Sequence, residues 1–156
     1  MSLIYLSLGS NLGDRGAYLS KAIGFIEQEI GPVTARSLFY ETDPWGFHST
    51  NKFLNACIAA ETTLSPSDCL GHLKGIETRL GRLKSAKNSY SDRVIDIDML
   101  FFDNIIQDAD DLILPHPHLH TRDFVLRPLL DIAPDLVHPV LKKTIRELFT
   151  RLSSQS

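Results

Sequence analysis

Apolar and polar positions along this chain repeat with two periods, one typical of helices and one typical of strands. Together they predict four strands and two helices before residue 103. Residues 15–30 repeat apolar side chains at helical spacing and end at Gly31-Pro32. A second helix is expected to begin after Ser65, a good N-cap residue, and to end near Leu80. Runs rich in β-branched and aromatic residues predict strands at 3–8, 33–42, 53–62 and 93–102.

These elements follow the order β-α-β-β-α-β, which predicts an α+β fold with a ferredoxin-like core. In that arrangement both helices cover one face of a four-stranded sheet, and we expect the other face to be free for a ligand. Additional C-terminal helices are predicted near 121–132 and 144–152. A chain of 156 residues with 43% hydrophobic positions is expected to form one domain, 1–156.

The overall composition argues against two classes of partner. A net charge of −3 and a pI near 6.0 are not typical of a general nucleic-acid binder. No apolar stretch is long enough to span a bilayer, and the first residues lack the basic start of a signal peptide, so we expect a cytoplasmic protein without a membrane partner. We also expect a monomer. Cys57 and Cys69 are interpreted as reduced core residues, with a disulfide left open.

Two carboxylates interrupt the apolar strand predicted at 93–102. Asp96 and Asp98 are two positions apart, so in a strand they share a face and lie about 6–7 Å apart. A cation such as magnesium with a phosphorylated ligand would neutralise this pair, whereas an ordinary surface strand would leave both acids solvated. The opposite face of the strand is predicted to hold Ile95, Ile97, Met99 and Phe101.

The segment before this strand is strongly basic within an acidic protein. Against the single acid Asp92 it carries five cations: Arg79, Arg82, Lys84, Lys87 and Arg93. A solvated basic loop would look the same, but its position beside the two aspartates favours a site for an anionic ligand.

The predicted strand at 53–62 has one face suited to a core and one suited to a ligand. Leu54, Ala56 and Ile58 form the more apolar face. On the other face, Asn55 stands beside Phe53, a pair that could bind the polar edge of a flat heterocycle. An asparagine bonded to a neighbouring loop is the alternative.

Four segments together resemble the 6-hydroxymethyl-7,8-dihydropterin pyrophosphokinase family. Each motif alone is weak, but they span almost the whole chain in the family's order and spacing. They are LGSNLGD at 8–14; YETDPWG at 40–46 with FLNA at 53–56; IE at 76–77 with LGR at 80–82 and DRVIDID at 92–98; and LPHPHLHTRDFVLRPL at 114–129.

The resemblance implies a ferredoxin-like enzyme of folate biosynthesis that transfers pyrophosphate from ATP to the pterin's hydroxymethyl oxygen and releases AMP. It implies two Mg²⁺ ions on Asp96 and Asp98, and it makes these aspartates, with Arg82 and Arg93, the catalytic residues. The residues implied for the nucleotide are Glu77, Arg82, Arg93, Ile97, His116 and Arg122. Those implied for the pterin are Thr42, Trp45, Phe53, Asn55 and Phe124.

The chain departs from the family pattern in the basic segment. Family members often carry Trp-Gly-Pro before the arginine, whereas this chain has Tyr90-Ser91-Asp92. Because the loop from Lys84 to Asp92 is polar and lacks apolar anchors, we expect it to be disordered without ligand and to close over ATP.

Two other functions stay open from the residues alone. A ferredoxin-like sheet often serves as a binding module without catalysis, although a sensor of an uncharged metabolite needs no cation site. A metal-dependent phosphohydrolase could use the two aspartates and the histidines. Three alternating histidines, His116, His118 and His120, could indicate zinc, but a positively charged or hydrogen-bonding His116 at the phosphates is favoured.

Overall fold

A computed structural model describes residues 1–44, 48–82 and 92–154. Most of the elements lie where the apolar periods predict them. In chain order they are β1 (Ser2–Ser10), α1 (Arg15–Glu29), β2 (Val33–Arg36), β3 (Tyr40–Thr42), β4 (Phe53–Thr62), α2 (Pro66–Arg79), β5 (Asp96–Phe102), β6 (Gln107–Ala109), β7 (Leu112–Leu114), η1 (Leu119–Thr121), α3 (Asp123–Ile132) and α4 (Ile145–Ser153).

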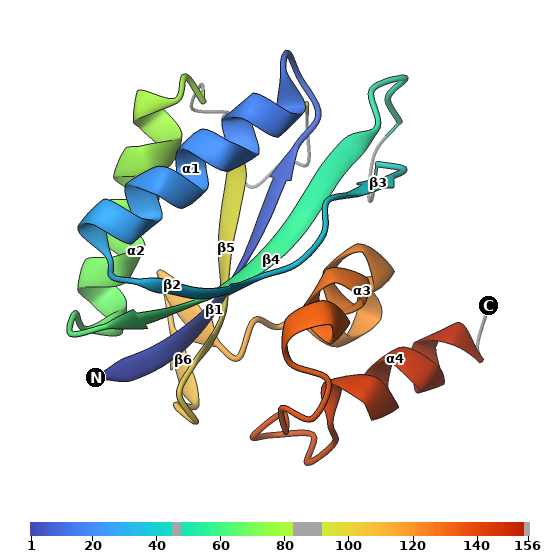
Figure 1. Ribbon diagram of the computed structural model, residues 1–156. Helices are drawn as coiled ribbons and strands as arrows, with labels where there is room; N and C mark the ends of the chain where they lie inside the picture. The colour runs from blue at the N-terminus through green and yellow to red at the C-terminus, as the bar shows by residue number, and fades with distance from the viewer. Residues whose placement is uncertain (45–47, 83–91, 155–156) are drawn as a thin grey trace.

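The main sheet is antiparallel, in the order β2-β4-β1-β5, and β3 extends it by pairing with β4. Helices α1 and α2 lie on one face of the sheet, and α3 and α4 lie on the other (Figure 1). Local signals place the first two helices: Asp14 accepts a hydrogen bond from the Ala17 amide, and Ser65 accepts one from Asp68. The α+β fold with C-terminal helices is therefore confirmed.

Two apolar cores use opposite faces of this sheet. The first lies under α1 and α2 and includes Leu6, Leu8 and Ile58. The second lies under α3 and α4 and includes Cys57 and Leu126. The expectation of a free second face was therefore only partly right, because α3 and α4 cover one end of it and leave the other end open beside Asp96.

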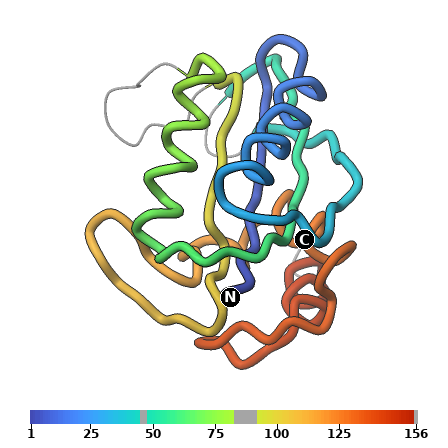
Figure 2. Tube along the Cα trace, turned by 60° about the vertical axis from the view of Figure 1, so that its left-hand side comes forward, coloured from blue at the N-terminus to red at the C-terminus, as the bar shows by residue number. Residues whose placement is uncertain are grey.

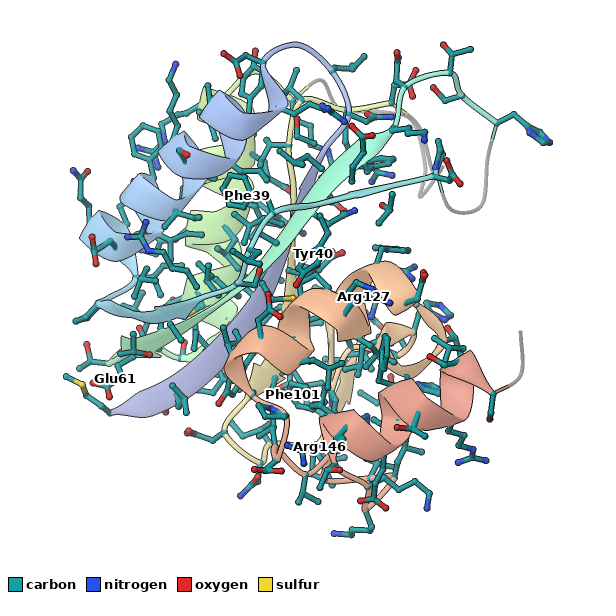
Figure 3. All side chains as sticks on the ribbon, turned by 45° about the vertical axis from the view of Figure 1, so that its right-hand side comes forward. Phe39, Tyr40, Glu61, Phe101, Arg127 and Arg146 are labelled. Atoms are coloured by element: carbon teal, nitrogen blue, oxygen red, sulfur yellow. The ribbon has the colours of Figure 1, made fainter. Side chains whose placement is uncertain are left out.

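A β-bulge in β5 changes the direction of its side chains. Leu6 pairs with Met99 but Tyr5 pairs with Phe101, so Leu100 is the extra residue. Ile95, Ile97 and Met99 enter the first core as predicted. Phe101 was predicted on that same face, and this was wrong: after the bulge it enters the second core, between the sheet and the C-terminal helices (Figure 3).

The strand predicted at 33–42 is broken into β2 and β3. The Ser37 amide donates to the Cys57 carbonyl, and the Ser37 hydroxyl then accepts from the Cys57 amide, each at 2.9 Å. The hydroxyl takes the place of a backbone carbonyl in the ladder, so the chain leaves the sheet after Ser37. Further along, Leu38 and Tyr40 hydrogen-bond to Asp131 of α3.

The hairpin formed by β6 and β7 was not predicted. Gln107 pairs with Leu114 and Ala109 pairs with Leu112. The hairpin follows β5 and lies near α2 (Figure 2). It forms one wall of the cleft described below.

Cys57 and Cys69 are free thiols and both are buried, which confirms their interpretation as reduced core residues. Among the described helices, none has the length and apolar character needed to cross a membrane. The monomeric state and the cytoplasmic location stay predictions.

Candidate active site

The candidate site lies at the open end of the second sheet face, where three strands meet. Gly9 of β1 stands between Asn55 of β4 and Asp96 of β5. Two residues earlier on β1, Ser7 pairs with Asp98. Because alternate residues of a strand share a face, this register places the aspartate pair and Asn55 on the same side of the sheet.

Two arginines surround Asp96. Arg82 Nη1 donates to Asp96 Oδ1 at 2.8 Å and to Glu77 Oε2 at 2.7 Å. On the other side, Arg93 Nη1 lies 3.6 Å from Asp96 Oδ2. The same Glu77 oxygen accepts from the Ile97 amide at 2.7 Å. Glu77 therefore fixes both Arg82 and the start of β5, and the two guanidinium groups lie beside one carboxylate.

Two acidic groups of this cluster have raised pKa values, because they are buried and lie beside another carboxylate. Burial and the neighbouring Asp96 raise the pKa of Asp98 well above its ordinary value. Burial and Asp96 also raise the pKa of Glu77 to about 7, although Arg82 opposes this. Asp96 and Asp98, two neighbouring carboxylates that repel each other, suit a hard cation.

The donor set fits magnesium. Magnesium commonly takes one or two carboxylates and completes its octahedron with water and substrate phosphates. Asp96 and Asp98 are two such carboxylates on one face of β5, and both line the same cleft. Within the described ranges, no group of three or more His, Cys, Asp and Glu side chains is placed to hold a metal ion.

His116 and Arg122 approach the aspartates from the segment after β7. His116 Nδ1 accepts from the His118 amide at 3.1 Å. Burial, with Arg122 and His118 nearby, lowers the pKa of His116 to about 4. The ring is therefore neutral at neutral pH, which favours the hydrogen-bonding interpretation over a positively charged His116. Arg122 is buried, and its guanidinium carbon lies 5.7 Å from the centre of the Phe124 ring.

Two cavities meet at this cluster. The larger is a cleft of about 810 Å³ between α2, β5, the β6–β7 hairpin and residues 116–118. The smaller, of about 40 Å³, lies over the ends of β1, β3 and β4. Four residues line both cavities: Arg93, Asp96, Asp98 and Arg122.

The smaller pocket gathers the residues expected at the pterin. It is lined by Thr42, Phe53, Asn55 and Phe124, together with Gly9. Asn55 Nδ2 donates to Thr42 Oγ1, so the alternative of an asparagine bonded to a neighbouring segment is also met, inside the pocket. The guanidinium carbon of Arg93 lies 5.6 Å from the Phe53 ring centre.

The residues expected at the nucleotide line the larger cleft. These are Glu77, Arg82, Arg93, Ile97, His116 and Arg122. Two predictions cannot be placed: Trp45 and the loop residues 84–91 lie outside the described residues.

Sequence reasoning missed Asn11 and Asp92. Asn11 was named only within the LGSNLGD segment and given no role of its own, yet it is buried and its Oδ1 accepts from the Arg93 amide at 2.7 Å. Its Nδ2 donates to Asp92 Oδ1 at 2.7 Å. No local pattern indicates these contacts, because they join segments about 80 residues apart; only the asparagine within the Gly-Ser-Asn-Leu-Gly turn could have drawn attention.

The chain is similar in sequence to proteins of one family. The family model described as 7,8-dihydro-6-hydroxymethylpterin-pyrophosphokinase matches residues 5–134. A 2-amino-4-hydroxy-6-hydroxymethyldihydropteridine pyrophosphokinase of Porphyromonas gingivalis is 48% identical over 141 residues, which cover 89% of this chain and 95% of the relative. The Aquifex aeolicus protein of the same name is 39% identical over 147 residues, covering 94% and 90% of the two chains.

The fold is also shared with solved structures. A wild-type Plasmodium falciparum HPPK-DHPS protein matches with a TM-score of 0.79 at 19% identity; the match covers 99% of this chain but only 44% of that one. At this identity the likeness shows the fold alone. The family model matches residues 5–134, and the two relatives are 48% and 39% identical to this chain. The chain therefore belongs to the 7,8-dihydro-6-hydroxymethylpterin-pyrophosphokinase family.

Proposed function

We propose that the larger cleft binds ATP with magnesium, that the smaller pocket binds 6-hydroxymethyl-7,8-dihydropterin, and that transfer occurs where they meet. The observation that carries this assignment is the set of four charged residues that lines both cavities. As a family member, the protein transfers the pyrophosphoryl group of ATP to the hydroxymethyl group of this pterin in folate biosynthesis.

The reaction places most of its charge on phosphate oxygens. The hydroxymethyl oxygen attacks the β-phosphorus and its hydroxyl proton is released to solvent. The bond from that phosphorus to the α–β bridging oxygen breaks, and AMP leaves with the electron pair. Arg82 and Arg93 are proposed to bind the triphosphate, because a guanidinium can bind two phosphate oxygens at once. Both guanidinium groups lie beside Asp96, which lines both cavities.

Asp96 and Asp98 are proposed to hold two magnesium ions. When bound, magnesium neutralises triphosphate charge and polarises the phosphoryl oxygens. The raised pKa of Asp98 supports this role, since a cation in the cleft would relieve the repulsion from Asp96. His116 and Arg122 are proposed to donate hydrogen bonds to phosphate, with Glu77 and Ile97 forming the wall behind them.

On the pterin side, the aromatic rings of Phe53 and Phe124 are suited to contact the two faces of a flat ring system. Asn55 and Thr42 would hydrogen-bond its amide-like edge. Trp45 is proposed to contribute as well, on the resemblance alone. Closure of the loop at 84–92 over ATP likewise stays a prediction.

The experiment that tests this function is product analysis with magnesium, ATP and the pterin. AMP should form only when all three are present. ADP would indicate simple phosphoryl transfer, and phosphate release without pterin would indicate the hydrolase alternative. Tight binding of the pterin without any turnover would favour the alternative of a binding module without catalysis.

Neutralising the aspartates should separate catalysis from folding. We expect Asp96→Asn and Asp98→Asn each to lower kcat by about 10²-fold or more, since metal and electrostatic contributions of this size are usual. The melting temperature of Asp98→Asn should be unchanged or higher, because a buried charge beside Asp96 is removed. Asp96→Asn loses its ion pairs with Arg82 and Arg93, so its kcat is compared only after circular dichroism shows that the variant is folded. Asp108→Asn, on the exposed edge of β6, is the matched control and should keep full activity. Near-normal kcat in both site variants would contradict the metal assignment.

A further inference from the structure

A hydrogen-bonded network joins three segments beside the site. Asp92 Oδ1 accepts from Asn11 Nδ2 at 2.7 Å, and Asp92 Oδ2 accepts from Asn51 Nδ2 at 3.3 Å. Asn11 Nδ2 also donates to the Asn51 carbonyl at 3.2 Å. Ser49 Oγ accepts from the Asn51 amide and hydrogen-bonds to Asp92. One carboxylate thus holds the segment that precedes β4.

The network fixes the backbone of Arg93. The Asn11 amide donates to the Arg93 carbonyl at 3.0 Å, and the Arg93 amide donates to Asn11 Oδ1 at 2.7 Å. Asn11 is only 3% exposed, so water competes little for these bonds. Arg93 is therefore held on both sides of its own backbone, one residue after Asp92.

The segments that the network joins carry residues that line the cavities. Arg93 lines the cleft and the small pocket, and its guanidinium lies over the Phe53 ring. Phe53, the first residue of β4, comes two residues after Asn51. A contact between Asp92 and Asn51 therefore links the backbone that carries a phosphate-binding arginine to the backbone that carries a pterin-contacting ring.

We propose that the Asp92 carboxylate is a clasp that holds Arg93 and Phe53 in their working positions by tying Asn51 to the start of the β5 segment. Asp92 is thus a positioning residue, which acts through its neighbours. This inference rests on the substrate sites proposed above.

Neighbouring hydrogen-bond donors stabilise the negative charge of the Asp92 carboxylate. Hydrogen bonds from Ser49, Asn11 and Asn51 lower the pKa of Asp92, so the group is ionised at neutral pH and accepts from both amides. Asp92 accepts the hydrogen bond that Asn51 donates, so the two side chains can be exchanged to test the contact. Exchanging the two side chains preserves the pair, whereas placing a carboxylate on both sides sets two acidic oxygens about as far apart as the present 3.3 Å contact.

The test is an exchange experiment. Asn51→Asp alone should lower kcat/KM for the pterin by about tenfold at saturating ATP, a loss in the range measured for neighbouring charged pairs. Adding Asp92→Asn to that variant should restore kcat/KM to within about threefold of the parent, as coupled residues do. Asp108→Asn is the control for loss of an exposed carboxylate and should leave both constants unchanged.

Two results would overturn the clasp. One is an exchanged double variant no more active than Asn51→Asp although its melting temperature matches the parent. The other is wild-type kcat and pterin KM in Asp92→Ala, which removes the carboxylate without adding a charge and covers the case in which Asn51→Asp does not fold. AMP release by the parent is measured first, so that failure of the proposed substrate sites is seen before any variant is compared.

Discussion

Gly9 shapes the small pocket by having no side chain. A Cβ built at this position would lie 3.0 Å from Asn55 Oδ1 and 3.5 Å from Phe53 Cδ1. Both neighbours line the pocket proposed for the pterin. The first contact is tighter than ordinary van der Waals packing, so Asn55 would have to move by a few tenths of an ångström.

We therefore predict that Gly9→Ala raises KM for the pterin by about tenfold, since displacing one well-placed polar contact is worth on the order of 1–2 kcal/mol. KM for ATP should stay the same, because Gly9 does not line the larger cleft. Gly24→Ala in α1 is the control: its added methyl meets open space and should stabilise the helix slightly. An equal rise of both KM values would contradict this local explanation.

At this scale the sequence was informative where chemistry depends on spacing within one strand. Asp96 and Asp98 could be assigned to one face because the strand period alone decides it. Asn11 and Asp92 could not be found in this way, because their roles arise only when segments distant in the chain are brought together.

Among the elements, the break between β2 and β3 depends on one hydroxyl. Ser37 is buried and its Oγ is the acceptor for the Cys57 amide. In Ser37→Ala that amide would lose its partner in the protein. We predict a fall in the free energy of unfolding of about 1–3 kcal/mol, the usual cost of an unsatisfied buried group.

Urea denaturation of Ser37→Ala would measure this change, with Ser67→Ala on the exposed first turn of α2 as the control. The control should lie within about 0.5 kcal/mol of the parent, as exposed substitutions usually do. If both variants had the same stability, the strand break would need another explanation than the Ser37 hydroxyl.

Element types were predictable where apolar period and capping agreed, as in α1 and α2. The strand at 33–42 was predicted as continuous because β-propensity cannot show that a side chain replaces a ladder carbonyl. The hairpin of β6 and β7 was missed because its short strands include Asp108 and adjoin Asp110 and Asp111, which do not resemble a buried strand.

For the whole molecule, the second core adds a pH dependence to stability. His138 is buried there, with its Nδ1 accepting from the amides of Val140 and Leu141 at 3.2 and 3.1 Å. Its ring contacts Phe101 edge-on, with 5.6 Å between ring centres. Burial, and more weakly His120, lowers the pKa of His138 below its ordinary 6.5.

Because protonation is harder in the folded state, the contribution of His138 to stability is complete above pH 6.5 and is lost as the pH falls toward the folded-state pKa. We predict that His138→Asn weakens the fall in unfolding free energy between pH 7 and 5, by at most about 1.4 kcal/mol per pH unit, the limit for one proton.

Urea titrations at pH 7, 6 and 5 would measure this difference. His48→Asn, at an exposed position, should leave the slope of the parent unchanged. His116 contributes to the same slope in both proteins, so the comparison isolates His138. Parallel curves for His138→Asn and the parent would contradict the buried-histidine explanation.

The order of elements was enough to predict the sheet and the side on which α1 and α2 lie. It could not predict that α3 and α4 would cover part of the opposite face, because both helices were assigned without a partner surface. The size of the open site therefore depends on a packing choice that no single element reveals.

The bulge at Leu100 has a consequence for how this protein can change over evolution. It divides β5 into a half that presents the aspartates and a half that anchors the C-terminal helices, with the extra residue between them. Substitutions that refit Phe101 to a changed α3 can accumulate without turning the aspartates away from the substrates. Deleting one residue between positions 98 and 101 would remove that independence, so we expect this short stretch to tolerate exchange of side chains far better than a change in length.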